Sequence, residues 1–357
     1  SIPLEDLPQD WDPPSGWLAH ANQLLVDPAT YPYPLGDQWA PPYRMARIAD
    51  RLESLRAAGP VDAAAMRELQ LDQVSPQMAR FAQLVYDRLD LVNDAELSLL
   101  AGLVSSMRDG RMNRERPAAA LMAAWFLAFS EAMLADDLPD DLREGVLRRR
   151  HPWLVEAALS EAGDAGSSGS GTSAASGAGP AAWCDDRRTL PKEDCAAILW
   201  RSLPAALVKL GIDDAPPELD GSIDLLLRRL PAWGQHHLTQ FPHSPFSEVA
   251  FLKPLFHRQI GNGGDTYTVN VANVDPVSLL QRNLPSYRQL IDLGRPEEAR
   301  FVQSTGQSGH PMSPHYDDLV RPHRDGDALP MRLDRVPPAG DLLILHPVVD
   351  GEPGVAP

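Results

Sequence analysis

The sequence lacks the short motifs by which many enzyme classes are recognised. It contains no glycine-rich phosphate-binding loop with a following lysine, no Gly-x-Ser-x-Gly elbow and no internal repeat. Nothing therefore indicates a P-loop enzyme or a hydrolase built on a nucleophile elbow. With 43% hydrophobic and 23% charged residues, the composition is that of a globular protein.

Long apolar runs and positive charge are also scarce. The longest apolar run, residues 118–129, is well short of the roughly 20 residues that a membrane-spanning helix needs, so it predicts a buried helix. The 32 basic residues are outnumbered by 49 acidic ones, and the net charge of −17 repels phosphate backbones and anionic lipids. We therefore expect no nucleic acid partner and no membrane insertion.

Only two cysteines are present, Cys184 and Cys195, and both are flanked by acidic residues. A metal site needs more ligands at closer spacing. A disulfide formed in an oxidising compartment is the preferred interpretation, and two unrelated free thiols are the alternative. The chain begins Ser1-Ile2-Pro3, with neither a Met nor a basic and apolar leader, so we expect no signal peptide in this sequence.

Proline is abundant, at 35 of 357 residues, and predicts long loops between the elements. Residues 1–40 combine proline with aromatic residues and show no helical period, so we expect an ordered surface loop with at most a short strand at residues 17–22. Loops of this kind often carry functional residues.

A helical tract follows this loop, and a strand-rich region ends the chain. Capping residues and apolar spacing predict a short helix after Asp62 and further helices at residues 45–55, 76–89 after Ser75, 94–108, 117–134, 140–158, 192–210 and 222–230. Residues 162–182 consist almost entirely of Gly, Ser, Ala and Thr and predict a flexible insertion. Strands are expected at residues 266–271, most clearly, at 300–303 and at 342–345. This order lacks the βαβ alternation of a doubly wound sheet.

Three segments have the residue types for chemistry, and the first is the block at residues 307–318. Its His310, His315 and Asp317 are ordinary ligands for a divalent metal. The two prolines and the glycine of the block also suit a rigid turn in which the histidines bond to the backbone, and this interpretation is preferred.

The second segment, residues 233–246, contains a histidine cluster among aromatic residues. Such a cluster is either an acid–base pocket or a half-buried packing element, and packing is favoured.

The third segment is the loop at residues 16–22, which ends at Asn22. A carboxamide donates two hydrogen bonds and does not titrate, so it suits the stabilisation of an oxyanion. Arg44 begins the next predicted helix and shares its face with Arg47 and Arg51. A guanidinium can hold the amide oxygen of Asn22 and leave the NH₂ group directed into a site. Spacing alone favours arginines on a solvated helix face.

Taken together, these segments resemble the C-terminal part of the β subunit in enzymes of the penicillin acylase family. These enzymes are N-terminal-nucleophile amidohydrolases. The resemblance extends in order over nearly the whole chain and is carried by Ile2-Pro3-Leu4, Pro14-Ser15-Gly16-Trp17-Leu18-Ala19 with Asn22, Pro42-Tyr43-Arg44-Met45-Ala46-Arg47-Ile48, Leu69-Gln70-Leu71-Asp72, Trp233-Gly234, residues 263–270 and residues 304–318. The last block and the Pro-Tyr-Arg-x-x-Arg-Ile segment are its specific parts.

The resemblance implies an α+β fold with the four-layer αββα architecture, of which this chain is the C-terminal portion. It also implies a precursor that cuts itself so that a serine becomes the first residue of the β subunit and attacks the amide. Asn22 matches the asparagine that binds the oxyanion, and Arg44 matches the arginine that supports it. Asp37 matches a carboxylate of a structural calcium site.

The nucleophile is expected to lie outside this chain. Ser1 is followed by Ile2-Pro3 rather than by the family's polar and aromatic signature, and Asn22 follows too soon. The expected partners are therefore the α subunit and the N-terminal part of the β subunit of the same precursor, and this fragment alone is expected to be inactive.

The resemblance implies hydrolysis of a linear amide in an acylated small molecule, such as a β-lactam side chain, an acyl-homoserine lactone or a lipopeptide, by a periplasmic or secreted enzyme. Residues 1–161 would supply the oxyanion loop and the helical tract, 162–182 the insertion, and 183–357 the terminal helices and strands. The alternatives are a metal-dependent hydrolase using His310, His315 and Asp317, and a family member without catalytic activity.

Overall fold

The computed structural model describes residues 2–91, 97–149, 152–161, 179–214 and 223–331. Within these ranges, helices form where the capping residues predict them. The carboxylate of Asp62 accepts a hydrogen bond of 2.8 Å from the amide of Ala65 and begins α2. The hydroxyl of Ser75 accepts one of 3.2 Å from the amide of Met78 and begins α3. Both predicted caps are therefore confirmed.

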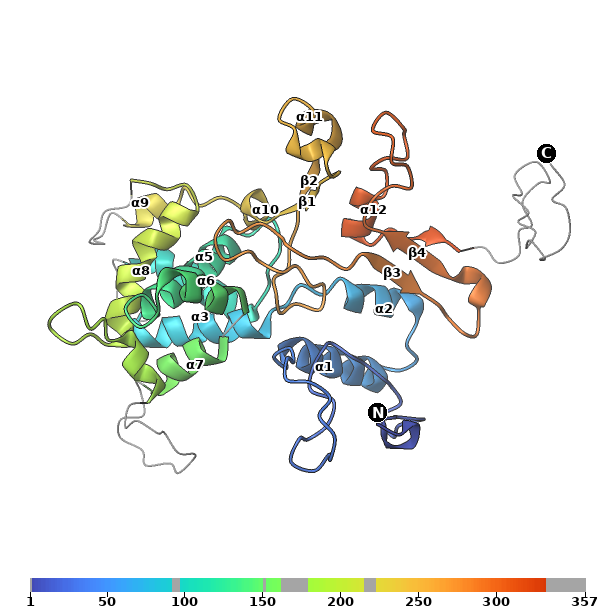
Figure 1. The fold of residues 1–357 in the computed structure, drawn as a ribbon, viewed down its shortest axis with the longest axis horizontal. Coiled ribbons are helices and arrows are strands. Elements are labelled where there is room, and N and C mark those ends of the chain that lie inside the picture. Colours follow the sequence, from blue (N-terminus) through green and yellow to red (C-terminus); the bar gives the residue numbers. More distant parts are fainter. Residues whose placement is uncertain (1, 92–96, 150–151, 162–178, 215–222, 332–357) are drawn as a thin grey trace, which may run out of the picture.

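The helices lie mainly in one half of the molecule and follow a loop that carries no strand at residues 17–22 (Figure 1). Their bounds are α1 (Tyr43–Ala58), α2 (Ala63–Gln70), α3 (Pro76–Arg88), α4 (Ser98–Ser106), α5 (Pro117–Met133), α6 (Asp140–Arg149), α7 (Pro152–Glu161), α8 (Cys195–Lys209) and α9 (Ile223–Leu227), with short helices α10 (Trp233–His236), α11 (Lys253–Phe256) and α12 (Val320–Asp325). No helix in the described ranges is both long and apolar enough to cross a bilayer.

The apolar core is built around α5, which corresponds to the longest apolar run of the sequence. Its Trp125 is completely buried, and the indole Nε1 donates to the carbonyl of Leu199 at 3.0 Å and to the hydroxyl of Ser202 at 3.1 Å. Both acceptors lie on α8, so α5 and α8 form the centre of the helical layer.

Two expectations in this layer have clear outcomes. The helix predicted at residues 140–158 is divided into α6 and α7, and Pro152 begins the second helix because proline cannot donate within a helix interior.

Cys184 and Cys195 form a disulfide that ties a 3₁₀ turn to the start of α8, so the alternative of two free thiols is wrong. Of the predicted flexible insertion at residues 162–182, residues 162–178 lie outside the described residues, whereas residues 180–182 belong to the 3₁₀ turn Pro180–Cys184. The predicted strand at 342–345 also lies outside the described residues.

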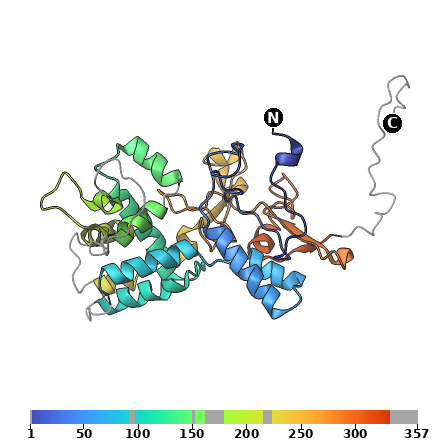
Figure 2. The ribbon, with the colours of Figure 1, turned by 90° about the horizontal axis from the view of Figure 1, so that it is seen from below.

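The strands form two small antiparallel sheets beside the helical layer (Figure 2). In the first, β1 (Leu238–Phe241) pairs with β2 (Arg258–Gly261), with Leu238 opposite Gly261. In the second, the order is β3 (Tyr287–Leu290), β4 (Arg300–Gln303) and β5 (Leu329–Pro330). The strand predicted at residues 300–303 is confirmed as β4. The arrangement is α+β, whereas the four-layer architecture stays a prediction.

The strand predicted most clearly, at residues 266–271, is wrong. Asp265 accepts hydrogen bonds from the backbone amides of Tyr267 at 2.7 Å and Thr268 at 3.0 Å, and these amides are therefore not available to a neighbouring strand. The segment is a buried turn, which the side chain of Arg288 fixes by donating to the Oδ1 atom of Asn270 at 2.6 Å. Burial lowers the pKa of Arg288 to about 10.

Candidate functional site

The loop that carries Asn22 is fastened to α1. The indole of Trp17 donates to a carboxylate oxygen of Glu53 on α1 at 2.9 Å, and the amide of Ala40 donates to the carbonyl of Asn22 at 2.8 Å. Asn22 itself has a φ of 61°, in the left-handed region, where asparagine is among the best-tolerated residues other than glycine. The preceding Ala21 is buried, whereas the side chain of Asn22 is exposed.

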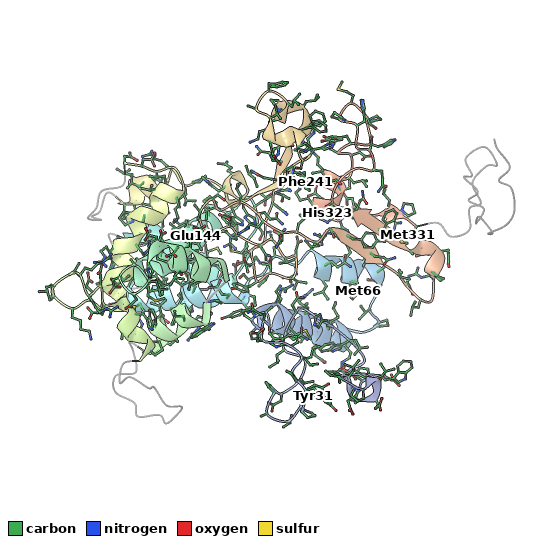
Figure 3. The ribbon with its side chains drawn as sticks, viewed as in Figure 1. Tyr31, Met66, Glu144, Phe241, His323 and Met331 are labelled. Carbon is green, nitrogen blue, oxygen red and sulfur yellow. A yellow bond between two sulfur atoms is a disulfide. The ribbon has the colours of Figure 1, made fainter. Side chains whose placement is uncertain are left out.

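Residues 2–42 fold back on themselves before reaching this loop. The hydroxyl of Tyr31 donates to the carbonyl of Asp6 at 2.6 Å, and that of Tyr33 donates to the Asp6 carboxylate at 2.9 Å. Tyr31 lies on the loop below α1 (Figure 3). These contacts agree with the ordered loop that the sequence predicts.

Arg44 orients the carboxamide of Asn22. Its Nη2 atom donates to the Oδ1 atom of Asn22 at 2.8 Å and to the carbonyl of Ala21 at 2.9 Å. Within the described part of the chain, no acceptor receives a hydrogen bond from the Nδ2 atom of Asn22. The amide oxygen is therefore occupied by a permanent cation, and the two amide hydrogens remain available to an incoming oxygen.

The other two arginines of this helix face converge on one carboxylate. Arg47 donates to Asp72 through Nη2 at 2.6 Å and through Nε at 3.1 Å, and Arg51 lies 3.9 Å from the same carboxylate. Asp72 also accepts a hydrogen bond from the amide of Val74 at 2.8 Å. Because the Asp72 side chain is only 9% exposed, this cluster binds α1 to the segment between α2 and α3. The expectation of solvated arginines is therefore wrong for this face.

The side chain of Asp37 is exposed. The part of the chain that the structure describes contains no group of three or more His, Cys, Asp or Glu side chains that could hold a metal ion. Calcium takes six to eight oxygen ligands, and the calcium site at Asp37 stays a prediction.

The block at residues 307–318 is a set of turns rather than a metal centre. Asp317 pairs with Arg258, and the Nδ1 atom of His315 contacts the carboxylate of Asp318 at 2.9 Å. The Nδ1 atom of His310 accepts from the amide of Met312 at 3.2 Å. His310 has the backbone contact that the turn interpretation predicts, whereas His315 contacts a side chain instead. No three His, Cys, Asp or Glu side chains of the described residues are grouped so that they could hold a metal ion.

Position 306 requires glycine, because the backbone of His315 lies too close to leave room for a β-carbon. The amide of Gly306 donates to the carbonyl of Tyr316 at 3.2 Å, and a β-carbon added at Gly306 would lie only 2.0 Å from the carbonyl oxygen of His315. Gly309, three residues later, has nothing within 4 Å of an added β-carbon.

We therefore predict that Gly306→Ala destabilises the complete protein by about 1–3 kcal/mol, the usual cost of overpacking. Gly309→Ala is the matched control and should stay within about 0.5 kcal/mol of the parent. Denaturant unfolding of the two variants measures the difference. Equal midpoints would contradict the close approach.

The histidine cluster at residues 233–246 serves packing. His237 is fully buried, its ring stacks on Trp233 with centroids 4.4 Å apart, and its Nδ1 atom contacts the carbonyl of Leu279 at 2.9 Å. Burial lowers the pKa of His237 to about 4, so the ring is neutral at pH 7. This confirms packing over an acid–base pocket for His237.

Comparison with known proteins then decides the family. The family model described as penicillin amidase matches residues 1–337, which is nearly the whole chain. The chain belongs to the penicillin amidase family. This agrees with the resemblance that the sequence carries.

Among its penicillin amidase relatives, the acyl-homoserine lactone acylase QuiP of Pseudomonas putida is 29% identical over 87% of this chain and 36% of the relative. The enzyme of that name from Pseudomonas fluorescens strain Pf0-1 is 29% identical over 92% of this chain and 38% of the relative. The penicillin acylase 2 proenzyme of Pseudomonas sp. strain SE83 has the same three values. The chain spans little more than a third of the length of these curated relatives.

Two contacts beside the candidate site were not predicted from the sequence. Asp72 lay in a matching segment, but nothing local indicated its pairing with Arg47. Tyr43 donates to Glu156 at 2.6 Å across 113 residues and anchors the start of α1 to α7. Burial and this hydrogen bond raise the pKa of Tyr43, so its hydroxyl stays protonated. Only a three-dimensional structure shows such a pair.

Proposed function

We propose that this chain supplies the oxyanion-binding asparagine of an amidohydrolase that cleaves a linear amide bond in an acylated small molecule. The observation that carries the proposal is the hydrogen bond of 2.8 Å between Arg44 and the amide oxygen of Asn22. It leaves the Nδ2 donor directed away from the arginine and exposed. Membership of the penicillin amidase family supports the reaction class.

In this proposal, a serine hydroxyl supplied by another part of the precursor adds to the carbonyl carbon of the amide. The hydroxyl proton passes to the serine's own α-amine and then to the departing amine. The carbonyl oxygen becomes negative when the carbon is tetrahedral, and the Nδ2 atom of Asn22 donates to it at that stage. Water then cleaves the acyl ester and releases the acid.

The names of the relatives suggest which amides to test. An acyl-homoserine lactone and a penicillin are the two substrate types that these names contain. We propose further that the chain is part of a processed precursor, as the word proenzyme indicates for one relative. The disulfide supports a periplasmic or secreted location.

The proposal is tested with the complete gene product, assayed for release of free amine from octanoyl-homoserine lactone and from benzylpenicillin. Hydrolysis of either one that persists in the presence of a chelator supports the serine mechanism. Complete loss that zinc restores would favour a metal-dependent hydrolase. If neither substrate is cleaved and the processing site has no serine, the protein is a non-catalytic family member.

Arg44 is expected to act as a positioning residue, because it holds Asn22 rather than the substrate. We predict that Arg44→Ala lowers kcat by about 10- to 100-fold, the value of a hydrogen bond to a charged group, and also lowers the stability of the complete enzyme. KM should change little, since Arg44 contacts no substrate in this proposal. Steady-state kinetics of the complete enzyme measures both constants.

Two variants make this test specific. Arg44→Lys keeps the positive charge and should restore part of kcat. Arg56→Ala removes an exposed arginine from the same helix, where it pairs with Glu53, and should alter neither activity nor stability. Equal kcat values for Arg44→Ala and Arg56→Ala would remove Arg44 from the site.

A further inference from the structure

An apolar pocket lies in the helical half of the chain, where α3, α5, α6 and α7 meet the loop at residues 265–276. Neither Asn22 nor Arg44 lines it. Its apolar wall includes Met78, Phe126, Leu134, Leu147, Val155 and Tyr267.

One polar side chain in this wall has an unused donor. Gln77, in the first turn of α3, is only 1% exposed and lines the pocket. Its Nε2 atom is buried and has no hydrogen-bond partner among the described residues. A buried donor without an acceptor costs free energy, and a ligand that brings an acceptor removes this cost.

The charges around the pocket limit the ligand further. No Lys, Arg or His is among the described residues that line it, whereas the buried acid Asp265 does line it. A carboxylate or phosphate entering this space would lose its water, would meet no cation among the described lining residues and would face an acidic side chain. The described lining therefore favours an uncharged acceptor.

We propose that this pocket binds a neutral, mainly apolar small molecule whose carbonyl oxygen accepts a hydrogen bond from the Nε2 atom of Gln77. Its hydrocarbon part fills the space between α3, α5, α6 and α7. The side-chain amide of Gln77 selects for a carbonyl, and the lack of a cation among the described lining residues selects against acids. This binding includes no chemical step and does not depend on the acyl-transfer activity.

The test is a calorimetric titration of the complete protein with 2-octanone and, separately, with octanoate. The ketone has no amide or ester bond, so its binding is independent of hydrolysis. We expect saturable binding of the ketone at one site and binding of octanoate that is weaker by at least about tenfold. No saturable binding of the ketone, or equal affinities for the two probes, would overturn the proposal.

Three variants locate the site. Gln77→Leu removes the donor at similar volume and should weaken ketone binding by about 2- to 10-fold. It should also raise the unfolding midpoint of the free protein, because a buried unpaired group is lost. Ala123→Phe places a ring in the pocket from α5 and should abolish binding. Asn22→Ala should leave binding unchanged, so failure here is distinguishable from failure of the proposed function.

Undiminished ketone binding by Gln77→Leu would show that the carbonyl is not held there and would overturn the proposal. The unfolding midpoint of Gln77→Leu is a second measurement. If Gln77 had only a structural role, this substitution would lower the midpoint instead of raising it. Because Gln77→Leu adds no bulk, the proposal stays testable if Ala123→Phe fails to fold.

Discussion

Replacement of Asn22 by alanine is expected to lower the acylation rate of the complete enzyme by about 10²- to 10³-fold, the usual effect of losing one oxyanion donor. The Nδ2 atom would be lost, while the backbone contact of Asn22 with Ala40 needs no side chain. Arg44 would keep its hydrogen bond of 2.9 Å to the carbonyl of Ala21, so the loop should retain its place.

Single-turnover kinetics with a chromogenic amide would isolate the acylation step. Processing of the precursor should be retained, because the side chain of Asn22 is exposed. The unfolding midpoint should fall only slightly, because alanine tolerates the φ of 61° less well than asparagine does. Gln38→Ala is a suitable control, since it removes another exposed carboxamide from the same loop region. Unchanged turnover of Asn22→Ala would remove Asn22 from the site.

A second large effect is expected on stability. Trp125→Ala should destabilise the complete protein by about 3–5 kcal/mol, the range found for large-to-small changes at buried aromatic residues. The side chain is completely buried in α5, and its removal leaves a cavity between α5 and α8. It also removes the donor that binds Leu199 and Ser202.

Two further variants separate the loss of packing from the loss of the indole hydrogen bond and provide an exposed control. Trp125→Phe keeps an aromatic ring but removes the indole donor, so it should be less destabilising than Trp125→Ala. Trp11→Ala deletes a side chain that is 93% exposed and should change stability by less than about 0.5 kcal/mol. Denaturant midpoints of the three variants are the measurement. A similar small shift for Trp125→Ala and Trp11→Ala would contradict the position of Trp125 in the core.

The predictions that succeeded depend on contacts within a few residues. Ser75 and Asp62 bond to backbone amides three residues ahead, and the sequence shows both partners of each contact. The same holds for the burial of α5, since a continuous apolar run cannot remain in water at low cost.

The prediction at residues 266–271 failed because a side chain competed with strand pairing. Alternating β-branched and aromatic residues favour a strand, but the carboxylate of Asp265 binds the amides that a strand would use. The pattern by itself does not show that the turn continues through Asn270.

The arginines of α1 show where spacing is insufficient. Arg44, Arg47 and Arg51 share a helix face, and spacing alone favoured solvent for all three. The contact of Arg44 with Asn22 followed from the chemistry of the two groups and from the family resemblance. The pairing of Arg47 with Asp72 requires that α1 and the segment after α2 lie together. The catalytic role of Asn22 and Arg44 stays a prediction.

The sequence by itself determined the helical tract, the negative net charge, the family and the identity of the Asn22 and Arg44 pair, because these depend on residue type and on near neighbours. Only the tertiary structure decided how the carboxamide is oriented, which carboxylate holds α1, and that Gln77 faces an apolar pocket with an unused donor. Each of these depends on contacts between distant segments, such as the 113 residues between Tyr43 and Glu156. Such contacts form only when the helices pack, and local patterns do not encode which faces meet.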